Sequence, residues 1–131
     1  MLGLDTNVLV RYLVRDDEAQ FEKANRLIKH GIRSGEEVFV SLLVLMETEW
    51  VLRSRYGLSK TEILEVISQL LDATQVQFED EPAIEESLTT WKNATADFAD
   101  CLIGAHHRRQ GCRATATFDS KARKLPSFVL L

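Results

Sequence analysis

The chain has 131 residues, of which 45% are hydrophobic and 27% charged, and its formal net charge at pH 7 is −4. This balance is typical of a globular protein and argues against intrinsic disorder, collagen-like repeats and a disulfide scaffold. Positive charge is concentrated in residues 106–124, where six Lys and Arg against one Asp give +5 and leave −9 for the rest. A basic segment of this kind is compatible with a polyanionic partner, and a solvated helix face explains it equally well.

The length and hydropathy indicate one domain without a membrane span. The size suits a single domain, which we expect to cover residues 1–131. The longest nearly apolar run, residues 38–46, is far too short for a bilayer, and the first residues lack the order of a signal peptide. We therefore expect a cytoplasmic protein, in which Cys101 and Cys112 are reduced thiols that fill the core.

Taken in chain order, the predicted elements alternate between strands and helices. Strands are predicted for residues 1–5, 38–40, 76–78, 113–117 and 127–130. Helices are predicted for residues 6–14, 17–34, 42–56, a segment that begins at Ser59, a segment with Pro82 in its first turn, and residues 98–109. This alternation predicts an α/β fold of three layers, with a central, mostly parallel sheet of four to five strands covered by helices on both faces.

Local signals set the ends and faces of several of these helices. Thr6 is a candidate N-cap for residues 6–14, and Ser59 with Glu62 forms a capping-box pattern. The helix over residues 17–34 is expected to end at Gly35. Its apolar stripe consists of Phe21, Ala24, Ile28 and Ile32. Further stripes are Ile63, Ile67, Leu70 and Leu71 in one helix and Ile84, Leu88 and Trp91 in the next.

Two acids stand where parallel sheets bind their ligands. Asp5 is placed at the carboxyl end of the first predicted strand, and Asp119 directly follows a later one. Ligands of open parallel sheets bind outside the carboxyl ends of the strands, so two such acids can converge on one crevice. Five acids in residues 79–86 have a simpler explanation, because acids near a helix N-terminus are stabilised by the helix dipole.

Glu47 is unusual because it shares an apolar helix stripe with Leu43, Trp50 and Val51. A buried lone carboxylate is costly, so it must be protonated, paired with an Arg or bound to a cation. A stripe that faces solvent is the remaining explanation. Asp97 and Asp100, at the start of a helix, are explained individually as an N-cap and a first-turn acid.

Together, Asp5, Glu47, Asp119 and an acid from the pair Asp97 and Asp100 suggest a cation site. Clustered carboxylates repel one another unless a divalent cation or shared protons neutralise them. Oxygen ligands without His or Cys favour Mg²⁺, Mn²⁺ or Ca²⁺, and carboxylate-bound Mg²⁺ commonly serves phosphate chemistry. The neighbouring His106 and His107 point about 100° apart on a helix, so they cannot chelate one ion together. They are better explained as basic side chains that interact favourably with the C-terminal end of the helix.

Four motifs carry a family resemblance that extends over nearly the whole chain. They are, in order, Leu4 to Leu9 (LDTNVL), Val44 to Glu47 followed by Trp50 to Leu52, Asp97 to Ile103 (DFADCLI), and Thr117 to Asp119 with Lys124 and Leu125 after it. A sequence with these motifs in this order resembles the PIN-domain ribonucleases, and most closely the VapC-type toxins of toxin–antitoxin pairs.

The resemblance implies a PIN-like fold with an acidic metal site for Mg²⁺ or Mn²⁺. Its ligands would be Asp5, Glu47, Asp100 and Asp119, with Asp97 as an auxiliary acid or only the helix cap. Thr6, Asn7 and Thr117 would orient the carboxylates. The implied activity is metal-dependent cleavage of RNA. The implied partners are a second copy of the chain and a small VapB-like antitoxin, which alone would bind operator DNA.

We expect hydrolysis by a metal-activated water, which leaves 5′-phosphate ends. Basic side chains would guide the RNA backbone. The candidates are Arg11, Arg15, Arg108, Arg109, Arg113, Lys121, Arg123 and Lys124. Two alternatives stay open at this point. One is a catalytically silent RNA-binding or regulatory module of the same fold, and the other is a receiver-like or dehalogenase-like domain that is phosphorylated on Asp5.

Overall fold

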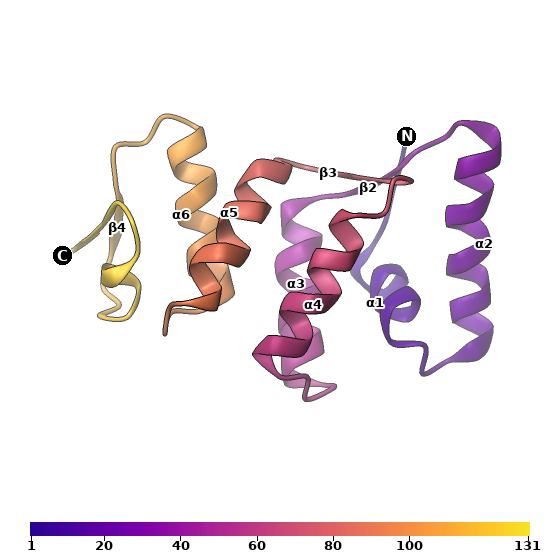
Figure 1. The fold of residues 1–131 in the computed structure, drawn as a ribbon, viewed down its shortest axis with the longest axis horizontal. Coiled ribbons are helices and arrows are strands. Elements are labelled where there is room, and N and C mark those ends of the chain that lie inside the picture. Colours follow the sequence, from indigo (N-terminus) through magenta and orange to yellow (C-terminus); the bar gives the residue numbers. More distant parts are fainter. The chain divides into compact units, whose positions relative to one another are not determined.

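The computed structural model describes residues 1–131, which group into two compact units, Met1–Glu79 and Asp80–Leu131. The chain forms six α-helices, one short 3₁₀ helix and five strands, and the ribbon in Figure 1 shows its course. All five strands pair in parallel, as the alternating sequence pattern predicts. Each unit is described below by itself.

The first unit contains a three-stranded parallel sheet in the order β1-β2-β3. Its strands are β1 (Leu2–Gly3), β2 (Val38–Val40) and β3 (Val76–Phe78). Parallel neighbours require long crossovers, and each crossover here contains two helices. Helices α1 (Thr6–Val14) and α2 (Glu18–Ser34) join β1 to β2, and α3 (Leu42–Ser54) and α4 (Lys60–Leu71) join β2 to β3. The register pairs Leu2 with Val38 and Val38 with Val76.

The predicted helix ends are largely confirmed. The Ser59 hydroxyl accepts a hydrogen bond from the Glu62 N–H, while the Glu62 carboxylate accepts one from the Ser59 N–H, which completes the capping box of α4. Helix α2 ends at Gly35, whose φ of 75° lies in the left-handed region that suits glycine. The cap of α1 was assigned to the wrong residue. Asp5 occupies that position, and its side chain accepts from the Thr6 N–H.

Most residues of the apolar stripes pack into the core of the first unit, whereas Phe21 and Leu71 are half-buried and Ile32 is exposed. Ala24 and Ile28 of α2 are buried, as are Ile63, Ile67 and Leu70 of α4. Ile32, which was expected to continue the α2 stripe, is 58% exposed. The buried residue in that turn is Gly31, which is covered by the backbone carbonyl of Glu36, so the close approach of the chain after α2 replaces a side-chain contact.

The second unit consists of a helix pair and a small parallel sheet. Helices α5 (Glu81–Lys92) and α6 (Phe98–Arg109) pack against each other, and the rings of Trp91 and Phe98 lie 5.2 Å apart. Strands β4 (Thr115–Thr117) and β5 (Phe128–Leu130) pair directly, with the 3₁₀ helix η1 (Ala122–Lys124) in their connection. Ile84, Leu88 and Trp91 are buried, which confirms the stripe predicted for α5.

A polar clamp at the start of α5 holds the two helices together. Asp80, whose φ is 49°, accepts hydrogen bonds from His106, at 2.8 Å, and from Arg109. Arg108 pairs with Glu86 and donates to the carbonyl of Pro126 at 2.7 Å. The helix dipole therefore does not account for Asp80 and Glu86, because both carboxylates bind specific side chains of α6.

These observations confirm the α/β class and the parallel pairing, and the five strands are compatible with the predicted four to five. The strands are hydrogen-bonded as one sheet of three and one sheet of two. No helix is long and apolar enough to span a membrane. Both cysteines are free thiols, but only Cys101 is buried, so the expectation that Cys112 fills the core is wrong.

Candidate active site

The first predicted acid, Asp5, lies just after β1 at the start of α1. The strand is continued by Leu4, which is buried and whose N–H donates to the Phe39 carbonyl at 2.9 Å. Asp5 itself is exposed, and its carboxylate accepts from the Thr6 N–H at 2.7 Å. Thr6 is buried, whereas Asn7 is exposed and its amide forms no hydrogen bond within the protein. The sequence therefore presents one acid and one amide at the carboxyl end of β1.

Glu47 lies on an exposed face of α3, which agrees with the explanation that its stripe faces solvent and excludes a buried carboxylate. Leu43 is 79% exposed and Trp50 50% exposed, which shows that the stripe containing Glu47 faces solvent. The buried acid of this helix is Glu49, which is 4% exposed and accepts from Arg53 at 3.0 Å. Sequence analysis missed it, because apolar residues surround the start of α3 and leave the orientation of its faces ambiguous.

Glu47 and Asn7 line the same hollow between α1 and α3. This hollow, of about 270 Å³, is here named the Trp50 pocket. Its lining comprises Thr6, Asn7, Val10, Arg11, Glu47, Trp50, Val51, Arg55 and Tyr56. Two of the predicted site motifs therefore meet in one concave surface of the first unit.

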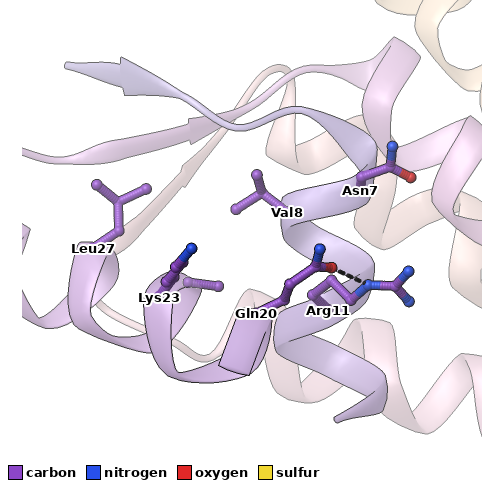
Figure 2. Close-up of a pocket in the computed structure, with 7 residues that line it drawn as sticks. Asn7, Val8, Arg11, Gln20, Lys23 and Leu27 are labelled. Atoms are coloured by element: carbon purple, nitrogen blue, oxygen red, sulfur yellow. Dashed lines mark hydrogen bonds between the residues drawn. The ribbon is translucent and has the colours of Figure 1, made fainter. Parts of the chain in front are cut away.

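A second hollow lies between α1 and α2 (Figure 2). Its volume is about 280 Å³ and its lining is mainly apolar, with Val8, Ala24 and Leu27 among the residues that form it. Asn7 and Arg11 line both hollows. The guanidinium of Arg11 donates to the side-chain oxygen of Gln20 at 2.5 Å, a contact visible in Figure 2.

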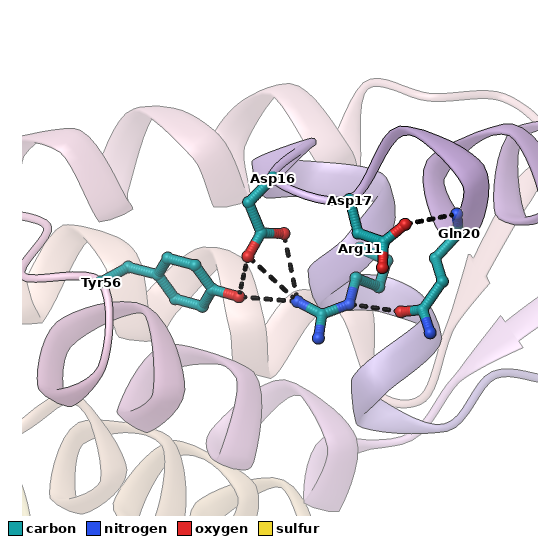
Figure 3. Close-up of polar contacts among 5 residues, drawn as sticks. All are labelled: Arg11, Asp16, Asp17, Gln20 and Tyr56. Carbon is teal, nitrogen blue, oxygen red and sulfur yellow. Dashed lines mark hydrogen bonds and ion pairs between the residues drawn. The ribbon is translucent and has the colours of Figure 1, made fainter.

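Arg11 and Tyr56 belong to a hydrogen-bonded cluster that links α1, α2 and the end of α3 (Figure 3). Arg11 donates to the Tyr56 hydroxyl at 2.8 Å and to Asp16 at 3.1 Å. Tyr56 in turn donates to Asp16 at 2.8 Å. The hydrogen bond from Tyr56, assisted by the charge of Arg11, lowers the pKa of the Asp16 carboxyl. The charge of Arg11 is thus compensated within the protein.

Arg15, the other basic residue predicted near this groove, is also paired. Its guanidinium donates to Glu18 at 2.7 Å and lies 4.1 Å from the centre of the Phe21 ring. The hydrogen bond with Glu18 raises the pKa of Arg15 and lowers that of the Glu18 carboxyl. In this structure Arg15 therefore stabilises the junction of α1 and α2.

The second unit holds the remaining predicted acids. Asp97 occupies the N-cap position of α6 but its side chain makes no capping hydrogen bond, and Asp100 follows in the first turn. Asp119 is fixed after β4, because its N–H donates to the Thr117 hydroxyl at 3.0 Å and its carboxylate accepts from the Lys121 N–H at 2.7 Å. Thr117 therefore positions the backbone that carries Asp119.

The Asp100 carboxyl is affected by the charges of the two other predicted site acids of this unit. Burial raises the pKa of the Asp100 carboxyl, and the charges of Asp97 and Asp119 raise it further. Asp100 thus interacts electrostatically with Asp97 and with Asp119, all within residues 80–131. Such mutual repulsion disfavours the ionised form and favours a cation nearby.

The chemistry of these side chains fits a hard divalent cation, since every donor is an oxygen and the group includes mutually repelling acids. Neither unit by itself contains three His, Cys, Asp or Glu side chains arranged to hold a metal ion. Asp5 and Glu47 belong to residues 1–79, while Asp97, Asp100 and Asp119 belong to residues 80–131.

The predicted basic residues divide into paired and unpaired groups. Arg108 and Arg109 form ion pairs with Glu86 and Asp80. The side chains of Arg113, Lys121, Arg123 and Lys124 form no ion pair or hydrogen bond within the protein. Lys121 and Lys124 line a small hollow together with Asn93 and Thr95. These four side chains remain available to a polyanion.

Comparison with known proteins identifies the family. A family model described as PIN domain matches residues 3–127. The chain belongs to the PIN domain family. This confirms the resemblance seen in the four acidic motifs, which all fall within the matched range. A PIN domain thus accounts for residues in both units, from Asp5 near the start of the match to Asp119 near its end.

Two individual proteins are similar to this PIN-family chain over most of its length. A protein named VapC ribonuclease from Aquifex aeolicus (strain VF5) is 26% identical over 122 residues, which cover 93% of this chain and 90% of that protein. The crystal structure of VapC20 from Mycobacterium tuberculosis, a toxin that cleaves the sarcin-ricin loop, covers 93% of this chain and 92% of its own. Its sequence identity is 21% and its TM-score 0.43.

Proposed function

We propose that this protein is a divalent-metal-dependent endoribonuclease and the toxin of a VapBC-type toxin–antitoxin pair. The observation that carries the proposal is the PIN domain match over residues 3–127, which contains all four acidic motifs. The similarity to a VapC ribonuclease over 93% of the chain supports the toxin assignment. The electrostatic interaction of Asp100 with Asp97 and Asp119 supports the cation requirement.

In this proposal Asp5, Glu47, Asp100 and Asp119 hold Mg²⁺ or Mn²⁺. A bound ion of this kind lowers the pKa of water and neutralises charge on a phosphate, which favours hydrolysis. Asp97 supplies a further negative charge beside Asp100. The acids of residues 1–79 and those of residues 80–131 act on one phosphodiester, so a single domain over residues 1–131 is part of the proposal.

The neighbouring polar groups of the chain keep the acids in place. The Thr6 N–H donates to Asp5, which fixes one carboxylate oxygen at the start of α1. The Thr117 hydroxyl accepts from the Asp119 N–H, which fixes the turn after β4. Asn7 has a free amide in the same hollow as Glu47, where it can donate to a phosphate oxygen of the substrate. Preorganised groups of this kind stabilise a transition state without reorganising during the reaction.

The RNA backbone is guided by cations whose charge is not already compensated. Arg113, Lys121, Arg123 and Lys124 meet this condition. Arg11, Arg15, Arg108 and Arg109 contact RNA in this proposal only by exchanging an existing ion pair for a phosphate. The unpaired group should therefore contribute more to the salt dependence of RNA binding.

The toxin assignment implies further partners. We propose a VapB-like antitoxin that neutralises the enzyme, a homodimer as the active form, a cytoplasmic location, and contact with DNA only through the antitoxin. A receiver-like or dehalogenase-like domain is disfavoured, because the family match assigns residues 3–127 to a PIN domain. A catalytically silent PIN module is distinguished from the nuclease by experiment.

The test is an RNA cleavage assay with the purified full chain. We expect cleavage of total RNA with Mg²⁺ or Mn²⁺, none with excess EDTA, and none by Asp5→Asn or Asp119→Asn. Glu85→Gln removes an exposed acid of α5 outside the proposed site and should cleave normally. Full activity in both Asn variants refutes the metal site. RNA binding in EDTA without any metal-dependent cleavage establishes the silent module instead, and a phosphorylated Asp5 establishes the receiver-like alternative.

A further inference from the structure

The Trp50 pocket contains a set of side chains that make no contact suited to their chemistry within the protein. Asn7, Glu47, Trp50 and Arg55 all line it, and none of their side chains forms a hydrogen bond, an ion pair or a ring contact. Pockets in which several polar groups converge on the same space are the usual sites of ligand binding. The composition of this group therefore describes what the pocket can bind.

The two guanidinium groups in the lining differ sharply. Arg11 is engaged by Asp16, Gln20 and the Tyr56 hydroxyl, as Figure 3 shows. Arg55, at the end of α3, is exposed and unpaired. Arg11 and Tyr56 consequently form a fixed wall of the pocket, whereas Arg55 presents an uncompensated cation. A guanidinium of this kind suits a phosphate, which it can bind through two parallel hydrogen bonds.

Trp50 offers a second type of contact in the same hollow. Half of its surface is exposed, and no other aromatic ring stacks on it. The other tryptophan, Trp91, is 5% exposed and packs on Phe98. An exposed indole and an unpaired Arg in the lining of one hollow are the combination that binds single-stranded nucleic acid, in which bases stack on rings and phosphates bind cations.

We propose that the Trp50 pocket is a nucleotide subsite of the RNA groove, in which one base stacks on Trp50 and its phosphate binds Arg55. The inference rests on the proposed function, since it places this nucleotide next to Glu47, which lines the same pocket. Stacking does not discriminate strongly among bases, so the subsite would hold an unpaired nucleotide of either a single strand or a loop. The volume of about 270 Å³ admits one nucleotide unit rather than a duplex.

A peptide arm is the competing occupant, and the charges argue for RNA. A peptide segment with a basic residue would form an ion pair with Glu47, but its charge would be repelled by the cation of Arg55 in the same pocket. An RNA nucleotide uses Arg55 and Trp50 directly, and Glu47 acts on it through a divalent ion. RNA thus provides a partner for Arg55, Trp50 and Glu47, which are three of the four unpartnered side chains, while a basic peptide provides one for Glu47 alone.

The experiment measures binding of a short fluorescein-labelled single-stranded RNA and of a labelled RNA hairpin by anisotropy, in EDTA to prevent cleavage. Trp50→Ala should weaken the binding of at least one RNA by about 5- to 100-fold. Trp50→Phe, which keeps a ring, should bind nearly as the wild type does. Arg55→Gln should weaken binding and reduce the slope of log affinity against log salt by about 0.7, the value for one lost contact to single-stranded phosphate.

Fluorescence adds a readout that a structural role would not produce. Stacking of a base on Trp50 should quench wild-type emission when RNA is added, because the buried Trp91 is shielded. Trp50→Phe should lose this quenching while it keeps its affinity. Leu43→Ala is the matched control for Trp50, as an exposed apolar residue of α3 outside the pocket, and Arg33→Gln is the control for Arg55. Both controls should bind RNA normally.

Three results would overturn the inference. Unchanged RNA affinity in Trp50→Ala and Arg55→Gln removes the subsite, even if the wild type cleaves RNA with metal. Unchanged RNA affinity together with lost inhibition by a co-expressed antitoxin makes the pocket a protein-binding site. Equal losses in the control variants make the effect nonspecific. Absence of metal-dependent cleavage, with the affinity losses still present, instead refutes the proposed function and leaves the subsite intact.

Discussion

Replacing Asp100 with Asn should stabilise the metal-free protein and remove its response to metal. Asp100 is partly buried at the start of α6, and burial together with the charges of Asp97 and Asp119 raises the pKa of its carboxyl. Because the raised pKa shows that the folded state disfavours the charge, ionised Asp100 costs stability at neutral pH. The neutral amide of Asn occupies nearly the same volume without that cost.

The expected gain is small and has a definite sign. Interactions of partly exposed charges are worth up to about 1 kcal/mol after solvent screening, and a first-turn acid recovers roughly 0.3 kcal/mol or more from the helix dipole. We therefore expect Asp100→Asn to raise the free energy of unfolding by about 0.5 kcal/mol in EDTA. The gain should shrink in high salt. Lowering the pH through the raised pKa should stabilise the wild type in the same way.

Bound metal should change the free energy of unfolding by more than this, and the change should favour the wild type over Asp100→Asn. A ligand at one hundred times its Kd stabilises the folded state by about 2.7 kcal/mol. Wild type should gain an increment of this size with saturating Mg²⁺ or Mn²⁺, and Asp100→Asn should gain much less. Urea unfolding curves with EDTA and with metal measure both differences, with Glu85→Gln as the control for loss of one negative charge. Equal metal-induced stabilisation of wild type and Asp100→Asn would show that Asp100 is not a ligand.

Two further predictions concern the scaffold. Gly31→Ala should lower the free energy of unfolding by about 1–2 kcal/mol despite the better helix propensity of Ala, because the added Cβ would lie 2.3 Å from the Glu36 carbonyl oxygen; a more stable variant in thermal unfolding would contradict this packing. Asp80→Asn should cost about 1–2 kcal/mol by weakening the contacts with His106 and Arg109. Burial by itself would raise the pKa of the Asp80 carboxyl, but the hydrogen bonds from His106 and Arg109 lower it. The stabilisation by the clamp is therefore complete above the ordinary pKa of 3.8 and is lost as the pH falls through the lowered pKa. If the unfolding curves of Asp80→Asn and wild type respond identically to acid, the clamp is refuted.

Local chemistry made most of the secondary structure predictable. Ser59 and Glu62 determine the start of α4 through side-chain hydrogen bonds to their own backbone, so nothing distant is needed. Gly35 ends α2 because its φ of 75° favours glycine. The strands were found because short apolar segments alternate with amphipathic helices. In each case the signal lies within a few residues of the structure that it specifies.

The faces of α3 were less predictable, because its sequence begins with five consecutive apolar residues, 42–46. A helix that is apolar all round at one end can be oriented in several ways, and only packing selects among them. The structure buries Leu45 and Glu49 and exposes Glu47 and Trp50. The exposed orientation of Glu47 suits a ligand better than the buried one, since a carboxylate at the surface can reach a metal and a substrate.

The partners of individual charges were the least predictable feature of the site. Asp80 looked like a first-turn acid, but it binds two side chains of α6 that lie 26 and 29 residues away. Arg11 looked like a groove cation, yet Tyr56, 45 residues away, accepts its hydrogen bond. Such pairings depend on how the helices pack in three dimensions, so no local sequence pattern predicts them. The motifs that contain the acids were recognisable because they occur in a fixed order, and the role of the acids as metal ligands stays a prediction.

Mn²⁺ binding monitored by electron paramagnetic resonance tests the central claim most directly, because it detects the ion without any need for the RNA substrate. The account predicts that the full chain binds Mn²⁺ at an acidic site and that Mg²⁺ competes for it. Asp5→Asn, in residues 1–79, and Asp119→Asn, in residues 80–131, should each abolish this binding, whereas Glu85→Gln should retain it. Wild-type affinity for Mn²⁺ in either Asn variant would contradict a shared metal site.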